Sequence, residues 1–188
     1  MTHNERRYSS ATARFTLDLP EWAVGKHNEL PECFTTDEDR MATVIEFSRL
    51  NFQRKTGGPF AAGVFERETG RLIVIGVNRV VPCHCSSAHA EVMALSLAQK
   101  TLGVYDLGGQ GQPVHQLVVN WCPCAMCLGA VLWSGVQSLM IAGRGPELEE
   151  TTGFDEGPIH PEWRTELKKR GIEQIEDVLR DEAIQAFR

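Results

Sequence analysis

The chain has 188 residues, 42% of them hydrophobic, and its 19 Lys and Arg against 25 Asp and Glu give a net charge of −6. This length supports one ordinary core, and the acidic balance gives no general attraction to a phosphate backbone or an anionic membrane. No apolar stretch is long enough to span a bilayer, and the polar residues 1–10 are not followed by the apolar segment of a signal peptide. We therefore expect one cytoplasmic domain that acts on a small molecule.

The N-terminal residues 1–36 mix Ser, Thr, Pro and charged residues without sustained periodicity. We expect them to form an arm that precedes a domain over residues 37–188. The domain should begin with a helix, because a capping side chain at Thr36 or Asp37 precedes apolar residues at helical spacing. This helix should end by Gly57, the first residue of a Gly-Gly-Pro sequence.

Two short runs rich in Val and Ile follow, at residues 61–65 and 72–77. They flank a polar loop and together predict a β-hairpin. Residues 88–102 carry apolar side chains along one helical stripe and predict a second helix. After a glycine-rich loop, residues 114–119 predict a third strand, which runs directly into a cysteine motif.

The rest of the domain alternates between helices and strands. Residues 124–133 form a compact apolar segment that predicts a buried helix, and residues 138–142 predict a fourth strand. The turn-rich residues 143–160 should be a loop. A helix over 161–170 then precedes a fifth strand near 172–178 and a terminal helix.

This order of elements predicts an α/β fold with a mixed five-stranded sheet between helices, in a three-layer α/β/α arrangement. Because a helix separates the fourth and fifth strands, a right-handed crossover should join them. These two strands are therefore expected to be parallel.

The candidate chemistry lies at the starts of the second and third helices. Six cysteines in a reducing compartment argue against a disulfide framework and leave thiols free to bind a metal. Successive helix N-termini meet at one edge of a layered sheet, so His89 can approach Cys124 and Cys127. One imidazole and two thiolates leave the fourth position of a tetrahedral zinc ion open to water, which is typical of a catalytic site.

An acid is needed beside such a metal centre to move protons. Glu91 lies two residues after His89, and a carboxylate there can take a proton from water and deliver it to the substrate. We therefore assign Glu91 as the general acid and base.

The sequence His-Ala-Glu at 89–91 together with Pro-Cys-Ala-Met-Cys at 123–127 resembles the H-x-E and P-C-x-x-C signature of zinc deaminases. With Gly-Gly-Pro-Phe at 57–60, these segments resemble bacterial guanine deaminases and their tRNA adenosine deaminase relatives, over residues 37–157. The resemblance implies the cytidine deaminase-like fold, zinc as cofactor and a homodimer.

The Gly-Phe-Asp-Glu sequence at 153–156 resembles the guanine deaminase branch in particular. It implies that Glu156 contacts the base and assists departure of ammonia, with Asp155 as the alternative. The resemblance also implies Asn78 as a hydrogen-bond partner of the base and Phe60 as a stacking surface. We further expect Ala90 and Trp121 in the substrate-binding set, although Phe60 and Trp121 could equally be core aromatics.

Three further thiols depart from the usual pattern of this family. Cys122 stands where Glu is usual, and Cys83 and Cys85 lie in the stretch before His89. Residues at i and i+2 on an extended segment do not face one point, so pocket lining or incidental thiols are the favoured interpretations over a second metal site.

Several other functions remain open from the sequence. The same centre could deaminate another amino-substituted ring, such as adenine, cytosine, a nucleoside or an aminotriazine. A tRNA adenosine deaminase should carry a basic surface, which the net charge of −6 does not favour. The alternative from another class is a catalytically silent zinc-binding module that serves interaction with a partner.

Overall fold

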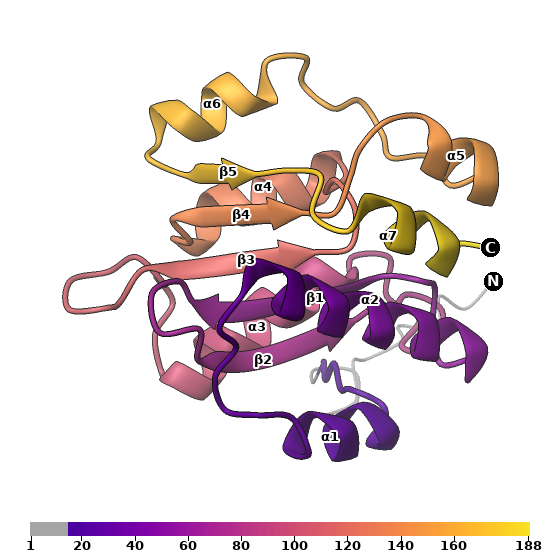
Figure 1. Cartoon of the computed structure of the whole chain (residues 1–188), viewed down its shortest axis with the longest axis horizontal. Coiled ribbons are helices and arrows are strands. Elements are labelled where there is room, and N and C mark those ends of the chain that lie inside the picture. Colours follow the sequence, from indigo (N-terminus) through magenta and orange to yellow (C-terminus); the bar gives the residue numbers. More distant parts are fainter. Residues whose placement is uncertain (1–14) are drawn as a thin grey trace, which may run out of the picture.

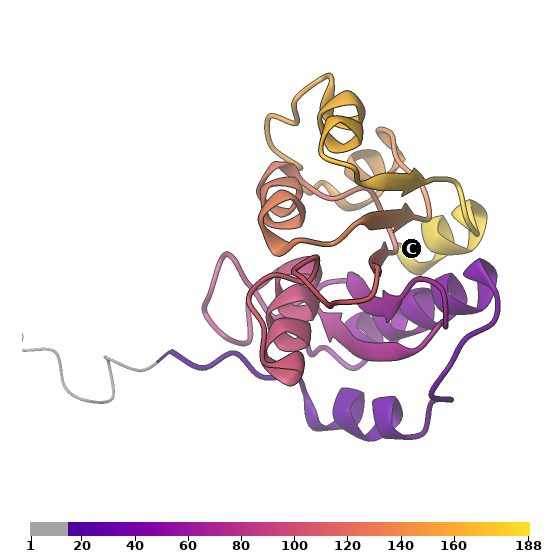
Figure 2. The ribbon, with the colours of Figure 1, turned by 90° about the vertical axis from the view of Figure 1, so that its left-hand side faces the viewer.

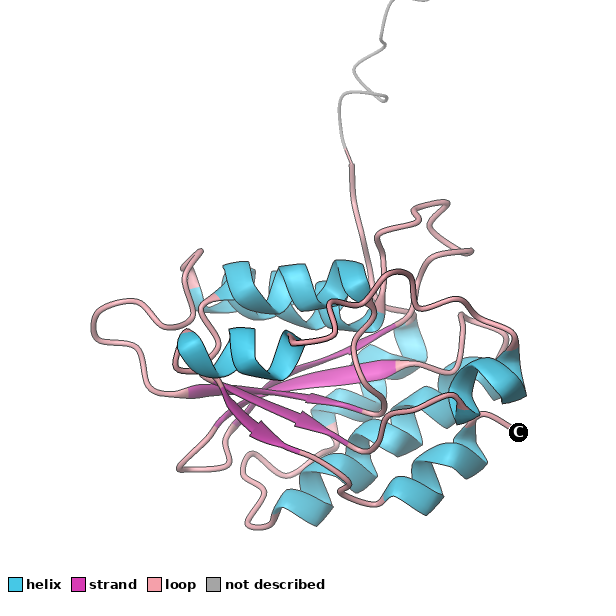
Figure 3. Ribbon diagram, turned by 90° about the horizontal axis from the view of Figure 1, so that it is seen from above, coloured by secondary structure: helices cyan, strands magenta, loops and turns pink. Residues whose placement is uncertain are grey.

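The computed structural model describes residues 15–188 and contains one five-stranded sheet with helices on both faces (Figure 1, Figure 3). The predicted three-layer α/β fold is confirmed. In chain order the elements are α1 Glu21–Asn28, α2 Asp37–Gln53, β1 Ala61–Glu66, β2 Leu72–Val77, α3 Ala90–Leu102, β3 His115–Val119, α4 Ala125–Ser134, β4 Ser138–Ile141, α5 Glu147–Thr152, α6 Trp163–Lys169, β5 Glu173–Ile175 and α7 Arg180–Ala186.

The sheet has the strand order β2-β1-β3-β4-β5. β1 pairs with both β2 and β3 in antiparallel fashion, whereas β3, β4 and β5 run parallel to one another. The predicted parallel pairing of the fourth and fifth strands is thus confirmed. Parallel neighbours require crossover connections, and α4 and α6 with their flanking loops supply them here.

Each face of the sheet has its own apolar core. One core packs side chains of α3, α4 and α6 against the strands, and the other packs α2, α5 and α7 against the opposite face. Figure 2 shows α3 and α4 on one side of the sheet with α2 and α7 on the other. Strands buried on both faces explain why their sequences are continuous apolar runs rather than alternating ones.

Both helices that carry the predicted metal ligands begin at the ligands themselves. His89 is the N-cap of α3 and Cys124 is the N-cap of α4, and both have extended backbone conformations. α3 and α4 contact each other, so their starts lie close together at one edge of the sheet. The strand–turn–helix order read from the sequence therefore brings the two motifs into one place.

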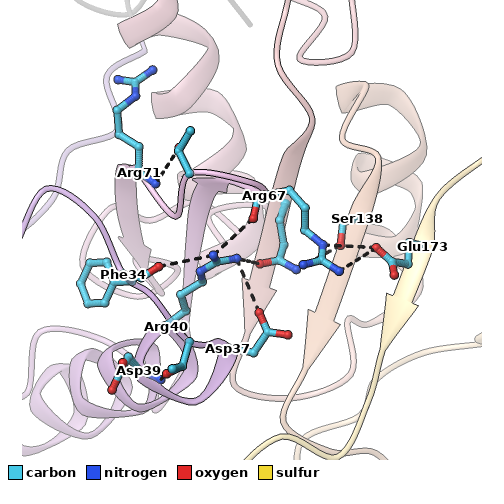
Figure 4. A network of polar contacts seen from close by, with 11 residues as sticks. Phe34, Asp37, Asp39, Arg40, Arg67, Arg71, Ser138 and Glu173 are labelled. Carbon is cyan, nitrogen blue, oxygen red and sulfur yellow. Dashed lines mark hydrogen bonds and ion pairs between the residues drawn. The ribbon is translucent and has the colours of Figure 1, made fainter.

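A buried arginine fixes the start of α2 to the rest of the domain (Figure 4). Arg40 donates hydrogen bonds to the side chain of Gln116 on β3, at 2.9 Å, and to the carbonyl oxygens of Phe34 and Arg67. Its guanidinium also lies 3.5 Å from the Asp37 carboxylate. A charge that is only 4% exposed is tolerated when acceptors surround it in this way.

Two helices were not predicted from the sequence. α5 occupies part of the stretch 143–160 that was expected to be a loop, so that expectation is wrong over 147–152. Only Leu148 of α5 is buried, so the sequence of this helix has no apolar period. An ion pair between Arg180 and Glu147 holds the start of the helix, and Gly153, in the left-handed conformation, ends it. α1 lies within the expected arm, whose residues 1–14 fall outside the described part of the chain.

Among residues 15–188, no helix combines the length and the apolarity that crossing a bilayer requires.

Candidate active site

A cavity of about 240 Å³ opens where β2 and β3 end and α3 begins. It is enclosed by residues from five separate segments of the chain, which are Gly58, Phe60, Asn78, Val80, Val81, His89, Glu91, Val119, Trp121, Cys122, Phe154, Asp155 and Glu156. Among the residues predicted for the site, Glu91, Glu156, His89, Asn78, Phe60, Asp155 and Trp121 therefore share one cavity.

The three predicted metal ligands form a cluster beside this cavity. The donor atoms of His89, Cys124 and Cys127 all lie within 4.8 Å of one another, and they form the one such group of three or more His, Cys, Asp or Glu among residues 15–188. The Nδ1 atom of His89 is 3.6 Å from the Sγ atom of Cys124. A tetrahedral zinc ion with Zn–N of about 2.05 Å and Zn–S of about 2.3 Å would hold these two atoms about 3.6 Å apart. The donor set fits zinc in both chemistry and spacing.

The two thiols respond to each other's charge. Hydrogen bonds from Cys127 and His89 lower the pKa of Cys124 to about 4, against the opposing effect of burial. The pKa of Cys127 is raised in turn, because its thiol donates to Cys124 and is itself buried. The two side chains therefore hold one thiolate readily, and a bound dication would stabilise the second.

Glu91 lies in the first turn of α3 and is only 7% exposed. Burial raises the pKa of its carboxyl group, and the nearby Cys124 thiolate adds to this effect. Desolvation makes the protonated form of this carboxyl group easier to reach, which suits a group that must both accept and release a proton.

Glu156 and Asp155 differ in what their side chains do. Burial raises the pKa of Glu156 to about 7, with further contributions from Cys124 and Glu91. The Asp155 carboxylate accepts a hydrogen bond from the backbone N–H of Gly157 at 2.7 Å, as in an Asx-turn. The backbone oxygen of Glu156 accepts from Ala125 N–H at 3.0 Å, which ties this loop to the start of α4.

Asn78 follows β2 directly and is 9% exposed. Its Oδ1 atom faces the backbone N–H groups of Gly58 and Val80, at 3.4 and 3.3 Å. The Nδ2 atom makes no hydrogen bond to any residue in the part of the chain that the structure describes, although the residue lines the cavity. The side chain therefore presents a hydrogen-bond donor there.

Aromatic residues form another part of the cavity wall. Phe60 lies 5.8 Å from Phe154 and 5.7 Å from Phe187, and Trp121 meets Phe187 edge to face at 5.5 Å, all as ring centroid distances. Phe187 thus packs behind the cavity of its own chain. Phe60 and Trp121 therefore each pack against the core and also line the cavity.

Of the remaining residues that the sequence singled out, Cys122 lines the cavity, whereas Ala90, Cys83 and Cys85 do not. Ala90 is fully buried in the core between α3 and β2 and does not line the cavity, so a substrate contact by this residue stays a prediction. Cys122 does line it, and burial raises the pKa of its thiol to about 12. Cys83 and Cys85 are outside the lining, and their Sγ atoms lie 3.8 Å from Asp18 and 3.2 Å from Ser87.

Val80, Val81 and Val119 line the cavity but were not singled out in the sequence. Val119 ends a continuous apolar strand and cannot be told there from any core valine. Val80 and Val81 belong to a turn that connects Asn78 to Ala88, and Arg79 N–H donates to the Ala88 carbonyl at 2.8 Å. That closure of the turn depends on tertiary geometry and has no sequence signal.

Comparisons with known proteins agree with this geometry. Residues 34–143 match the family model described as "Cytidine and deoxycytidylate deaminase zinc-binding region". The guanine deaminase of Bacillus subtilis (strain 168) is 34% identical over 117 residues, which cover 62% of this chain and 69% of that protein. A solved structure of guanine deaminase from Nitrosomonas europaea is 46% identical with a TM-score of 0.88, and the match covers 93% of this chain and 94% of that one. A second solved structure at 46% identity and TM-score 0.88, covering 93% and 91%, is a complex with 2,6-diaminopurine.

Proposed function

The chain belongs to the cytidine and deoxycytidylate deaminase family of zinc-dependent hydrolytic deaminases, and within this family we propose that it converts guanine and water to xanthine and ammonia. The observation that carries the proposal is the pair of carboxyl groups, the buried Glu91 and the half-buried Glu156, in one small cavity beside the metal cluster. The two relatives named as guanine deaminases support the choice of base.

We assign His89, Cys124 and Cys127 as the zinc ligands. Bound zinc supplies a Lewis acid that lowers the pKa of coordinated water from about 15.7 to about 7. Cys122 is excluded from our ligand set because its Sγ atom is not part of the cluster of donor atoms formed by His89, Cys124 and Cys127, and lies instead against the carbonyl oxygen of Pro123. Cys124→Ala should therefore lose zinc and Cys122→Ser should keep it, as measured by metal content after gel filtration. Equal metal content in the two variants would contradict the ligand set.

Glu91 and Glu156 then divide the proton transfers. Glu91 takes the proton released by water and delivers it to ring N3 of guanine, whose C2 is attacked. Glu156 accepts from the N1 and amino edge of the base and assists protonation of the departing amine. Its pKa of about 7 suits a group that must donate and accept at neutral pH.

The other cavity residues orient the base. Asn78 offers its Nδ2 donor to an acceptor atom of the ring, and Phe60 and Trp121 provide apolar and stacking contacts. The volume of about 240 Å³ lies below the about 300–1,000 Å³ of typical ligand pockets, which suits a free base better than a nucleotide. An RNA substrate is further disfavoured by the net charge of −6.

Three wider assignments complete the proposal. We place the protein in the cytoplasm, since its six free cysteines fit a reducing compartment. We place it in purine metabolism because guanine is the proposed substrate. We treat residues 37–188 as the deaminase domain and residues 1–36 as an N-terminal extension. We also propose a homodimer, because α4 exposes Met126, Leu132 and Trp133 on one face.

A panel of substrates tests the function. Zinc-loaded protein is incubated with guanine, adenine, cytosine, adenosine, cytidine and an aminotriazine, and released ammonia is measured. We expect turnover of guanine to exceed that of every other compound. Preference for another ring would move the assignment to that substrate, and silence towards all of them with zinc bound would favour an interaction module.

Glu156→Gln and Asp155→Asn test the second carboxyl group as a matched pair. Because the Asp155 side chain is engaged by Gly157, we expect Asp155→Asn to retain most of kcat for guanine. Glu156→Gln should lower kcat by about 10²-fold or more, the usual scale for loss of an acid–base group. The reverse order of the two effects would transfer the role to Asp155.

A further inference from the structure

Asn51 is a buried amide near the end of α2 whose hydrogen-bonding atoms are all used, although it does not line the cavity. Its Nδ2 atom donates to the carbonyl oxygens of Gly58 and Asn78, each at 2.9 Å. Its Oδ1 atom accepts from the Thr56 hydroxyl at 2.8 Å. One side chain thus joins the two backbone segments that carry Gly58 and Asn78 into the cavity wall.

Thr56 extends this network towards the N-terminus. The indole Nε1–H of Trp22 on α1 donates to the Thr56 hydroxyl oxygen at 2.9 Å. The Thr56 carbonyl accepts from Arg79 Nη1 at 2.7 Å, and Arg79 Nε donates to the carbonyl oxygen of Asp18 at 3.0 Å. The segment around Asp18 and Trp22 therefore supports the cavity wall on both sides of Asn78, through Thr56 and through Arg79.

The contact between these segments leaves no room for adjustment. A Cβ atom on Gly57 would lie 1.9 Å from the Asn78 carbonyl oxygen and 2.5 Å from Asn51 Nδ2. The backbone of residues 56–58 thus lies directly against that of Asn78. A shift of this loop must move Asn78 with it, because packed backbones transmit displacement.

The same loop decides which way the Asn78 amide faces. Its Oδ1 atom is directed at Gly58 N–H and Val80 N–H, so the Nδ2 donor is left for the cavity. Gly58 keeps its position through the bond from Asn51 to its carbonyl oxygen. If that support loosens, the amide loses the contact that selects its orientation.

We propose that Asn51 and Thr56 are positioning residues for Asn78, and that the N-terminal segment with Asp18 and Trp22 supports the pocket that binds the base. The inference rests on the proposed function, in which Asn78 contacts the base. It gives a role to residues that precede the family match, which begins at residue 34. These residues act through Asn78 and do not touch the substrate.

Thr56→Val is the sharpest test, because it keeps the shape of the side chain and removes the hydroxyl that joins Trp22 to Asn51. We expect KM for guanine to rise about 3–10-fold with kcat within twofold, as for loss of one or two hydrogen bonds that orient a binding group. Thr43→Val is the matched control, since the Thr43 hydroxyl bonds only to the Asp39 carbonyl on the exposed side of α2. It should leave KM unchanged.

A double-mutant cycle separates positioning from general loosening of the fold. In an Asn78→Ala background the Thr56→Val change should have no further effect on KM, because the group that it positions is gone. Trp22→Phe, which removes the indole N–H but keeps an aromatic ring against Phe47, should raise KM in the same direction as Thr56→Val. An unchanged KM in Thr56→Val, or the same fold-change with and without the Asn78 side chain, would overturn the proposal.

Hydrogen exchange of the backbone gives a readout that does not depend on guanine. Amides over residues 78–81 should exchange faster in Thr56→Val than in wild type and Thr43→Val. If the zinc-loaded wild type fails to turn over guanine, the proposed function falls, and this measurement still decides the positioning. Faster exchange over 78–81 then supports it, and equal exchange in all three proteins overturns it.

Discussion

Glu91 shows how one residue obtains its chemistry from its place on a helix. It lies in the first turn of α3, two residues after the N-cap His89, so the turn that delivers the imidazole also delivers the carboxyl group. Its exposed fraction is 7%, and burial raises the pKa of the carboxyl group. The spacing in the sequence therefore carries both the proposed ligand His89 and the proposed proton carrier Glu91 into the same small volume.

Replacing this carboxyl group tests its role without disturbing the metal cluster. Glu91→Gln keeps the size of the side chain, so zinc content should stay at the wild-type level. The rate of guanine deamination should fall by about 10³-fold or more, because a positioned acid–base group contributes about 10²–10⁴-fold. Glu182→Gln, at an exposed position in the first turn of α7, is the control and should match wild type. Appreciable turnover by Glu91→Gln would assign the proton transfers to another group.

At the residue scale, the sequence predicted the parts of the site that depend on short spacings. His89 with Glu91, and Cys124 with Cys127, are each placed by one helix turn, so local geometry suffices to bring each pair together. Val80, Val81 and the bracing residue Asn51 depend instead on how a loop closes against a distant segment. No local pattern encodes that closure, and these residues look like ordinary turn and helix residues in the sequence.

At the scale of elements, the placement of α3 depends on one glycine in β2. A Cβ atom on Gly76 would lie 2.4 Å from the backbone nitrogen of Ala94 and 2.7 Å from the carbonyl oxygen of Ala90. α3 can therefore lie flat on the strand only because residue 76 has no side chain. The start of α3, with the proposed metal ligand His89 at its N-cap and Glu91 in its first turn, is set by this contact.

Gly76→Ala should push α3 away from the sheet. We expect the free energy of unfolding to fall by about 2 kcal/mol or more, the upper part of the range for overpacking where backbone rather than a flexible side chain is in the way. Zinc affinity should fall as well. Gly25→Ala is the control, since nothing lies within 4 Å of the added atom in α1, and a small gain in stability is expected. Denaturant unfolding and zinc titration measure both effects, and equal stability of the two variants would contradict the packing argument.

The elements after β4 are held together by one carboxylate. Glu176 accepts from Arg164 Nε at 2.6 Å and Nη2 at 2.8 Å, and from Arg144 Nε at 2.8 Å. These bonds tie α6 and the loop after β4 to the end of β5. They also lower the pKa of the Glu176 carboxyl group below its usual value of 4.5.

Because the pKa of Glu176 is lowered in the folded protein, the direction in which stability changes with pH is determined. Glu176 contributes stability that is fully present above its unfolded pKa and is lost as the pH falls through the lower folded pKa. Glu176→Gln should therefore cost about 1 kcal/mol at pH 7, after allowance for solvent screening of the partly exposed arginines. The difference from wild type should shrink below pH 4.5 and vanish in stronger acid. Urea unfolding at several pH values measures it, and a difference that grows on acidification would contradict the assignment.

The same scale shows where sequence patterns stop being informative. The elements with long apolar runs or stripes, such as β2 and α3, were predicted within about two residues of their observed ends. α1 and α5 were missed because each buries a single residue, Ala23 and Leu148, and has no stripe of buried apolar side chains. Contacts with the rest of the domain, rather than an apolar period, make these two segments helical.

At the scale of the whole molecule, α4 presents an unusual outer face. Met126 is 41% exposed, Leu132 36% and Trp133 88%, although the helix is otherwise apolar and buried. Beside it, a groove of about 300 Å³ lies between α4 and α6, and its lining includes Leu132, Trp163 and Arg170. An exposed tryptophan next to an apolar groove is typical of an interface, and an isologous pair of such faces would cover both.

The proposed homodimer can be tested by replacing Trp133. Trp133→Gln should raise the dissociation constant of the dimer at least about 30-fold, because an interface tryptophan commonly contributes about 2 kcal/mol or more. Sedimentation over a range of protein concentrations measures the shift. Phe52→Gln provides the matched control, since Phe52 is 51% exposed on α2, in the opposite helical layer, and its loss should leave the dimer intact. Zinc content should be unchanged in both variants, because neither side chain contacts the metal cluster. A wild-type protein that stays monomeric at high concentration, or equal dissociation of the two variants, would place the contact between subunits elsewhere or exclude it.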